Sequence, residues 1–364
     1  MKVTETREHE HRVIEQVACA SSSCGEVLRG GTKVRIVSGI QPTGELHIGN
    51  YFGALRHWVA LQSEAECFFM LADLHAITTP QNPAELRERI VNTAALLLAI
   101  GIDPARSVFL LQSRVPQHSE LAWVLTCFTS MGELRRMAQF KDKVVRGGES
   151  AATAGLFAYP VLQAADILLY QADRVPIGDD QRQHLELTRT LAQRFNTQHP
   201  GTFQVPEPLI AAEGARIMDL HDPRKKMSKS SKSPAGLIRL IDSPEAIRSK
   251  ITCATTDSEH EIRSSPDKPG ISNLIAIYAL VSGVGTEHVE STFSGTAYAD
   301  FKNVLADKLV DYLRPFHERY EQLSHERGYV ERILLEGSDR AQATAIRTLA
   351  SVYERVGFLD VPPA

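Results

Sequence analysis

Two segments that lie far apart in the chain combine glycines, a helix start and lysines. The first, 39–50, reads Gly-Ile-Gln-Pro-Thr-Gly-Glu-Leu-His-Ile-Gly-Asn and follows a strand-like stretch at 34–38. Such a strand-to-helix turn offers free backbone N–H groups and the helix dipole to a phosphate. The second, 226–230, reads Lys-Met-Ser-Lys-Ser, and its lysines can neutralise charge as a polyphosphate reacts. A short Lys/Ser run alone is usually a solvated loop, but the two segments in this order predict ATP chemistry.

A polar stripe lies on an otherwise apolar stretch at 159–170. Tyr159, Gln163, Asp166 and Tyr170 are spaced by three or four residues, so they share one face of a helix. A carboxylate there must reach solvent or find a donor, because burial without a partner is costly. An internal ion pair or helix cap would satisfy Asp166. A substrate would satisfy it too, since an indole N–H offers only a donor and a carboxylate is an acceptor.

A third segment, 176–189, runs from a strand end through Gly178 into a helix. Ligands gather at such positions in open α/β sheets. Carboxylates at a helix start are also ordinary partners of the helix dipole, so both interpretations stay open for Asp179 and Asp180.

These segments belong to a chain in which short apolar strands alternate with longer amphipathic helices from residue 33 onward. We expect strands at 33–39, 67–72, 108–112 and 174–177. We expect helices at 49–62, 84–100, 118–130, 160–170 and 180–196, with Pro160 in the first turn of the fourth. This alternation predicts a parallel sheet with helices on both faces. The interval between the last two strands is too long for one crossover helix, so it holds a helical insertion at 118–146.

Strand signals disappear after residue 236, where helices are expected at 243–250, 271–282, 298–325 and 339–356. The chain of 364 residues is long enough for two domains, and its 43% hydrophobic content can fill both cores. We therefore expect a poorly ordered extension at 1–32, an α/β domain at 33–235 and an α-helical domain at 236–364.

The formal net charge of -4 means that a nucleic acid must be held by local basic patches. Solvated charged faces are the alternative interpretation of the two candidates, which are Arg135, Arg136, Lys141, Lys143 and Arg146, and Arg224, Lys225, Lys226, Lys229 and Lys232.

The five cysteines are odd in number and lack paired C-x-x-C spacing, which favours a reducing, cytoplasmic compartment and no zinc site. No apolar stretch approaches the roughly 20 residues of a membrane span. We expect no membrane association and no dedicated metal site.

The two opening segments resemble the signatures of the class I aminoacyl-tRNA synthetases, His-Ile-Gly-His and Lys-Met-Ser-Lys-Ser. Asn50 replaces the final His of the first, a variant that looks like the tryptophanyl branch. The resemblance to the tryptophanyl-tRNA synthetase family extends from residue 34 to about 320 and includes 71–78, 132–141 and 268–274.

This resemblance implies a Rossmann-like parallel-sheet catalytic domain with a helical insertion that supplies much of a homodimer interface, and an α-helical C-terminal domain that binds the tRNA anticodon. It implies that L-tryptophan is activated by ATP with Mg²⁺ and then transferred to tRNA(Trp). The implied tryptophan contacts are His75, Tyr159, Gln163, Asp166 and Gln181. The implied catalytic residues are His47, Lys143, Lys226 and Lys229. The implied ATP contacts are Gln41, Pro42, Thr43, Gly49, Asn50, Gly178, Asp179, Asp180, Ile217, Lys226, Met227, Ser228, Lys229 and Ser230.

The chain departs from the family pattern at two positions. Val37 stands where many members have a large aromatic residue, and Gln163 where many have Met. Tyr159, Gln163 and Asp166 also form the pattern with which tyrosyl-tRNA synthetases hold a phenol, so a tyrosyl enzyme is the alternative. The segments 40–44 and 166–170 look tryptophanyl and decide our choice. A small nucleotidyltransferase would not need the lysine segment, and a non-enzymatic RNA-binding relative would be expected to have lost one ATP segment.

Overall fold

A parallel five-stranded sheet forms the centre of the computed structural model, which describes residues 28–29, 32–138, 140–141, 153–178, 181–210, 216–228 and 234–359. The strand order is β5-β4-β3-β6-β7, and every pairing is parallel. The strands are β3 (Arg35–Ile40), β4 (Glu66–Leu71), β5 (Val108–Leu111), β6 (Arg174–Ile177) and β7 (Glu207–Ile210). The first four confirm the predicted strands. The edge strand β7 was not predicted, because Pro208 lies within its short run.

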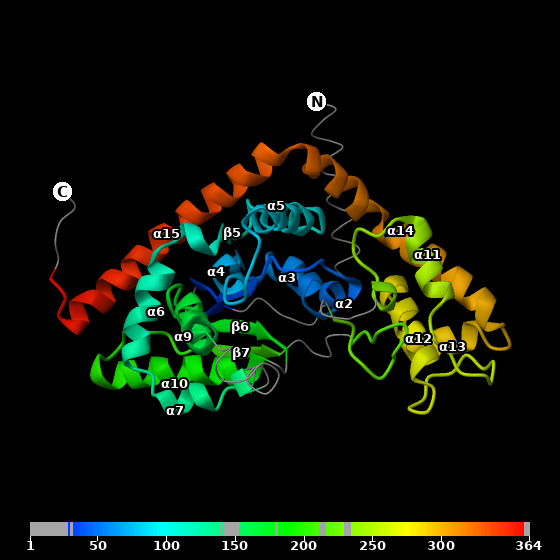
Figure 1. Cartoon of the computed structure of the whole chain (residues 1–364), viewed down its shortest axis with the longest axis horizontal. Coiled ribbons are helices and arrows are strands. Elements are labelled where there is room, and N and C mark those ends of the chain that lie inside the picture. The colour runs from blue at the N-terminus through cyan, green and yellow to red at the C-terminus, as the bar shows by residue number, and fades with distance from the viewer. Residues whose placement is uncertain are drawn as a thin grey trace.

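The side chains of the sheet alternate between two cores, as the period of two in a strand requires. Phe69 and Phe109 face the core that contains Trp58, whereas Phe68 and Leu110 face the other core. Helices therefore cover both faces, which confirms the predicted α/β architecture (Figure 1). The helical elements along this part of the chain are α2 (Ile48–Asn50), a π-helical turn (Tyr51–Leu55), α3 (Arg56–Leu61), α4 (Asp73–Ala76), α5 (Pro83–Ala99), a 3-10 turn (Gln112–Arg114), α6 (Gln117–Cys127), α7 (Met131–Arg135), α9 (Ala154–Leu168) and α10 (Arg182–Gln198).

The helix that carries Asp166 begins earlier than predicted. Helix α9 starts at Ala154, where the Thr153 hydroxyl accepts the N–H of Leu156 at 3.1 Å, and Pro160 lies inside the helix. The prediction of Pro160 in the first turn was wrong because a threonine cap, and not the proline, sets the start. Tyr159, Gln163 and Asp166 therefore do lie on one helix, while Tyr170 follows its end.

The chain beyond residue 236 is helical within the described residues, as predicted. Its helices are α11 (Pro244–Thr252), α12 (Pro269–Ser282), α13 (Thr286–Thr292), α14 (Tyr298–His325) and α15 (Arg327–Val356). No single described helix combines the length and apolar composition of a membrane span. Only α12 and α13 together pass that test, and the chain bends by 104° between them.

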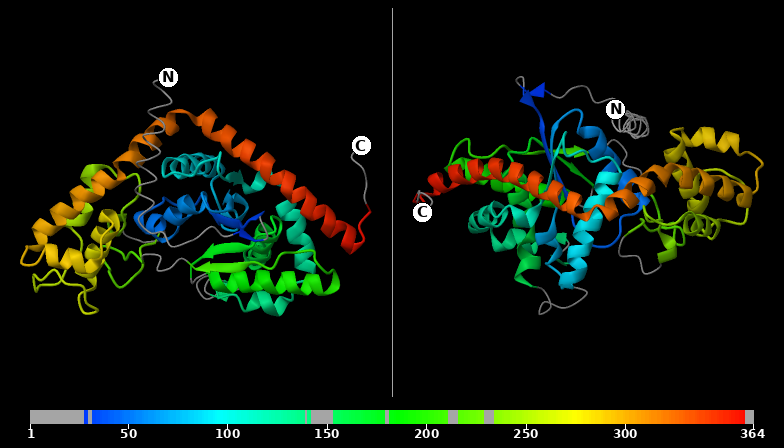
Figure 2. Two further views of the ribbon diagram at one scale, coloured as in Figure 1. Left: turned by 180° about the vertical axis from the view of Figure 1, so that it is seen from behind. Right: turned by 90° about the horizontal axis from the view of Figure 1, so that it is seen from above.

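The last helix, α15, packs against the sheet of the α/β domain, although the sequence places it in the separate helical domain. Figures 1 and 2 show α14 rising from the group of α11, α12 and α13, and α15 descending across the sheet region. There the N–H of Leu111 donates to the Ser338 hydroxyl at 3.1 Å. A Cβ at Gly337 would lie 1.8 Å from the Phe109 carbonyl oxygen, so only glycine allows this approach. Helix α15 thus covers the edge strand β5, whose exposed N–H groups need partners.

The predicted N-terminal extension, 1–32, falls on residues 1–27, 30 and 31, which lie outside the described residues, and on two short paired strands. Strand β1 (Leu28–Arg29) pairs with β2 (Thr32–Lys33) in antiparallel register. The end of the predicted extension is therefore structured.

Candidate active site

Asp166 is buried at the carboxyl ends of the central strands, where it accepts hydrogen bonds from three elements. Its Oδ2 lies 2.7 Å from Nε2 of His75 on α4. Its Oδ1 accepts from Nε2 of Gln112, just after β5, at 2.7 Å, and lies 2.6 Å from Nδ1 of His118 on α6. Burial by itself raises the pKa of Asp166, but the two histidines outweigh it, so that the pKa lies well below its usual value. Asp166 is therefore a buried, ionised acceptor.

An internal partner, one of the two interpretations open from the sequence, is therefore present. These internal hydrogen bonds do not occupy every acceptor position of the carboxylate. Two carboxylate oxygens offer about four acceptor positions, and the contacts to His75, Gln112 and His118 use three of them. No other described residue donates to Asp166, so the remaining position, on Oδ2, can accept one further N–H or O–H.

The other residues predicted to contact the amino acid lie around this carboxylate. The His75 ring faces the Tyr159 ring edge-on, with centroids 6.1 Å apart. The Gln163 amide donates to Oε1 of Gln181 at 3.3 Å, which joins α9 to the start of α10. The Tyr159 hydroxyl lies 2.8 Å from Nε2 of His184, and burial raises the pKa of Tyr159 to about 12. The structure thus brings together the five predicted residues, and Tyr159 presents a neutral hydroxyl.

Sequence reasoning missed Gln112, His118 and His184. Gln112 directly follows the strand that ends at Leu111, where an open α/β sheet collects ligands. A search for a donor to Asp166 at the ends of the predicted strands would have found Gln112. His118 has no such signal, because its helix is set over the sheet only by packing.

The first signature is held by contacts within its own turn. His47 is the N-cap of α2, and its backbone N–H donates to Oδ1 of Asn50 at 3.2 Å. A Cβ at Gly49 would lie 3.0 Å from Nδ1 of His47 and 3.5 Å from Cβ of Met227. A side chain here would therefore crowd the His47 ring, while Met227 of the lysine segment lies at ordinary contact distance from Gly49.

The lysine segment is anchored through its backbone. The N–H of Met227 donates to the Ile217 carbonyl at 3.0 Å, and both side chains are buried in the core that contains Ile48. Lys226 and Ser228, on either side of Met227, are exposed. The N–H of Ile48 donates to the carbonyl of Ile238 at 3.0 Å, which ties the first signature to the chain beyond the lysine segment. The two signatures therefore lie close together in the structure.

Asn273 on α12 clamps the strand-like residue that pairs with Lys226. Its Oδ1 accepts the N–H of Met218 at 2.9 Å, and its Nδ2 donates to the Met218 carbonyl at 3.0 Å. Met218 in turn forms a β-bridge with Lys226. The segment 268–274, singled out by resemblance alone, therefore fixes the base of the lysine segment.

The remaining predicted ATP contacts divide into two groups. Gln41 is exposed, Pro42 is buried and Thr43 is half-buried in the turn after β3. The carbonyl of Gly178 accepts the N–H of Gln181 at 3.0 Å, at the entrance to α10. Lys143, Asp179, Asp180, Lys229 and Ser230 lie outside the described residues.

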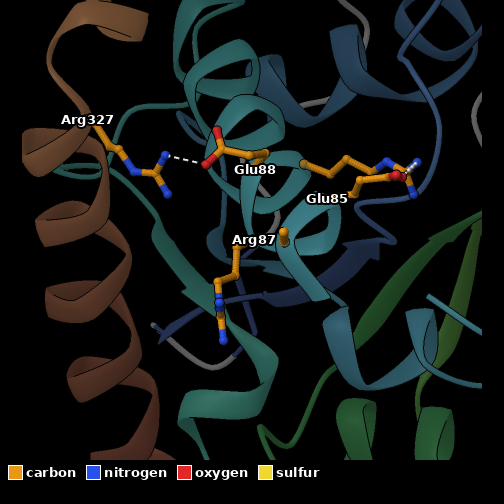
Figure 3. Close-up of a pocket in the computed structure, with 6 residues that line it drawn as sticks. Glu85, Arg87, Glu88 and Arg327 are labelled. Carbon is orange, nitrogen blue, oxygen red and sulfur yellow. Dashed lines mark hydrogen bonds and ion pairs between the residues drawn. The ribbon is translucent and has the colours of Figure 1, made fainter. Parts of the chain in front are cut away.

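A separate surface depression lies between α5 and the start of α15 (Figure 3). Two exposed ion pairs line it, Arg327 with Glu88 at 2.6 Å and Arg89 with Glu85 at 2.7 Å. None of the predicted site residues lines it, so it is not the candidate active site. Among the described residues, no group of three or more His, Cys, Asp or Glu side chains could hold a metal ion.

Comparisons with known proteins agree with this geometry. Residues 29–314 match the family model described as tRNA synthetases class I (W and Y). The chain is 51% identical over 327 residues to tryptophan–tRNA ligase 2 of Streptomyces avermitilis. The match covers 89% of this chain and 97% of the relative.

Two solved structures are similar as well. Tryptophanyl-tRNA synthetase from Mycoplasma pneumoniae has a TM-score of 0.81 and 38% identity, covering 90% of this chain and 99% of its own. The enzyme from Campylobacter jejuni, complexed with ADP and tryptophan, has a TM-score of 0.78 and 35% identity, covering 89% of this chain and 100% of its own. The chain belongs to the class I tRNA synthetases of the tryptophan and tyrosine group.

Proposed function

We propose that the chain is a tryptophan–tRNA ligase, which activates L-tryptophan with ATP and transfers it to tRNA(Trp). The observation that carries this function is the buried, ionised Asp166 with one acceptor position left. An indole N–H is a donor without acceptor capacity, so it is matched to that position. A tyrosyl specificity is disfavoured because a relative with 51% identity over most of the chain is a tryptophan–tRNA ligase.

In the first half-reaction a carboxylate oxygen of tryptophan attacks the α-phosphorus of ATP. The new P–O bond gives tryptophanyl-adenylate, and the bond to the β-phosphate oxygen breaks to release pyrophosphate. The ribose hydroxyl at the end of the tRNA then attacks the adenylate carbonyl, and AMP leaves. No covalent enzyme intermediate is needed, so catalysis consists of positioning and charge neutralisation.

The amino-acid side of the site holds the substrate through side chains on α4, α9 and α10. Asp166 accepts from the indole N–H, and Gln181 receives the α-amino group. Tyr159, Gln163 and His75 contact the part of the substrate that lies between Asp166 and Gln181. The bond from Gln163 to Gln181 supports this assignment, because it orients the Gln181 amide.

The nucleotide lies over the first signature. Gln41, Pro42, Thr43, Gly49 and Asn50 surround it there, while Gly178, Asp179 and Asp180 hold the ribose and Ile217 contacts the adenine. Lys226, Lys229 and Lys143 neutralise the phosphates and His47 donates a hydrogen bond towards them, with Met227, Ser228 and Ser230 completing the lysine segment. Mg²⁺ enters with ATP, because this ion prefers phosphate and water oxygens to an all-protein cage.

We assign two surfaces to macromolecular partners. The exposed cations around Arg224 and Arg135 suit tRNA phosphates, with α11 to α14 as the anticodon-binding part.

Trp123 on α6 and Met131 on α7 are 68% and 59% exposed within the predicted insertion. Large exposed apolar side chains are frequent at subunit interfaces. Their exposure supports a homodimer built on this insertion, and sedimentation of the purified chain tests that oligomeric state. The cytoplasmic location stays a prediction from cysteine usage.

The function is tested by ATP–pyrophosphate exchange with each of the standard amino acids in turn. We expect exchange with tryptophan and no other amino acid at comparable concentration. Exchange that depends on tyrosine instead would show a tyrosyl specificity. Exchange with no amino acid would contradict the proposed activation reaction.

A further inference from the structure

His118 is a buried link between Asp166 and Tyr170. Its side chain is fully buried, and so is the ring of Tyr170, which stacks on Phe68 with centroids 4.7 Å apart. Nδ1 of His118 lies 2.6 Å from Oδ1 of Asp166, and Nε2 lies 2.8 Å from the Tyr170 hydroxyl oxygen. One imidazole therefore joins the carboxylate to a phenol from the far side of the proposed substrate pocket.

The positions of the protons follow from these contacts. Asp166 accepts only, so Nδ1 of His118 must carry a proton. Burial raises the pKa of Tyr170 well above its ordinary value, so its hydroxyl keeps its proton. Among the described residues, Nε2 of His118 is the hydrogen-bond partner of that hydroxyl, at 2.8 Å. The proton on Nδ1 of His118 is therefore directed at Asp166.

The donors are distributed unequally over the two carboxylate oxygens. Oδ1 receives His118 and Gln112, whereas Oδ2 receives His75 alone. Two donors from different elements hold Oδ1 and prevent the carboxylate from turning. The open acceptor position therefore stays on Oδ2, which is also the oxygen nearest His75 and, through it, the Tyr159 ring.

We propose that His118, held in one orientation by Tyr170, is a positioning residue that directs Oδ2 of Asp166 at the indole N–H of tryptophan. The inference rests on the proposed role of Asp166 and adds a cause for its geometry. His118 contacts no substrate. It acts through the carboxylate, so its loss should weaken only what the carboxylate recognises.

The experiment compares tryptophan with β-(3-benzothienyl)alanine, in which sulfur replaces the indole N–H and removes the donor. Steady-state ATP–pyrophosphate exchange gives kcat/KM for each, and their ratio measures recognition of the N–H. We expect the unaltered enzyme to prefer tryptophan on the order of 10- to 100-fold, as for a hydrogen bond to a charged acceptor. His118→Leu should lower this ratio towards unity, mainly by raising KM for tryptophan, and leave the analogue nearly unchanged.

Three further variants separate positioning from packing. The amide nitrogen of His118→Asn can replace Nδ1, so this variant should retain most of the preference. Tyr170→Phe removes the hydroxyl that holds the His118 ring at Nε2, and this variant should lose part of the preference. Tyr298→Phe loses a buried hydroxyl that donates to Asp257 at 2.8 Å, away from Asp166, and should keep all of it.

Equal loss of kcat/KM for both substrates in His118→Leu would mean that His118 only fills space, and would overturn the proposal. If His118→Leu does not fold, an unchanged ratio in Tyr170→Phe overturns it instead. Absence of any preference in the unaltered enzyme is a different result. It would remove Asp166 as the indole acceptor, and with it the basis of this inference.

Discussion

The two sides of the proposed active site are built in different ways. On the amino-acid side, the recognising group is a buried carboxylate held by side chains from three elements. On the nucleotide side, Met227 is buried and anchored through its backbone while Lys226 beside it is exposed. A buried, pre-paired acceptor discriminates between substrates because a mismatch leaves it unsatisfied. Exposed cations discriminate little, but they can meet charge as it develops on a polyphosphate.

The two sides also depend on different parts of the chain. The donors to Asp166 come from the ends of β4 and β5 and from α6. The lysine segment depends instead on α12, through the clamp between Asn273 and Met218. Changes on one side should therefore alter amino-acid recognition and changes on the other should alter the rate of adenylate formation. Four substitutions test this separation.

Asp166→Ala should have the largest effect. It removes the indole acceptor and leaves His75 and His118 facing each other across a cavity, so kcat/KM for tryptophan should fall on the order of 10³-fold or more. ATP affinity, measured by titration calorimetry, should stay nearly the same. Retained activation with unchanged discrimination among amino acids would refute the role of Asp166.

Lys229→Ala should lower the rate of adenylate formation on the order of 10²- to 10³-fold, as for the loss of one group that neutralises developing charge. Tryptophan affinity should change little. Single-turnover kinetics measure the rate, and equilibrium titration the affinity. Lys225→Ala is the matched control, since Lys225 is exposed and pairs with Asp222 at 2.6 Å. An unaffected rate in Lys229→Ala would exclude this lysine from the mechanism.

Asn273→Ala should lower kcat and the free energy of unfolding together, because the N–H and carbonyl of Met218 lose their partner. We expect a loss of about 1–3 kcal/mol in urea unfolding, with tryptophan affinity unchanged. Asn196→Ala is a matched control, since Asn196 makes the same pair of hydrogen bonds to the backbone of Phe203. A similar fall in kcat in both variants would show general destabilisation and not loss of the lysine segment's support.

Glu133→Gln should have the smallest effect and a pH dependence of known sign. The hydrogen bond from Arg194, at 2.6 Å, lowers the pKa of Glu133 from 4.5 to about 2. Its contribution is present above pH 4.5 and is lost as the pH falls to about 2. We expect the variant to lose about 1–2 kcal/mol of unfolding free energy at neutral pH.

That difference should shrink as the pH falls through this window, which urea unfolding at a series of pH values measures. The exposed pair of Glu331 with Arg327 provides the control, because Glu331→Gln should change little at any pH. A difference for Glu133→Gln that does not vary with pH would contradict the assignment.

Much of the framework could be predicted from local patterns. Four strands of the sheet follow from short apolar runs, and three helices beyond residue 236 lie within a few residues of their predicted bounds. Predictions were wrong where two local signals competed. Pro160 is a plausible first-turn residue, but Thr153 offers a hydroxyl to a free N–H and sets the helix start. Strand β7 was missed because its proline and its length argue against a strand when the neighbouring β6 is not known.

By itself the sequence determined the two ATP signatures, the α/β alternation and the carboxylate on an apolar helix, because each of these is a pattern of neighbouring residues. The tertiary structure alone decided which groups meet. His118 lies 48 positions from Asp166, Asn273 lies 55 from Met218, and Ser338 lies 227 from Leu111. Contacts at such separations arise from how helices pack on the sheet, and packing depends on the shapes of both partners, which no local spacing records.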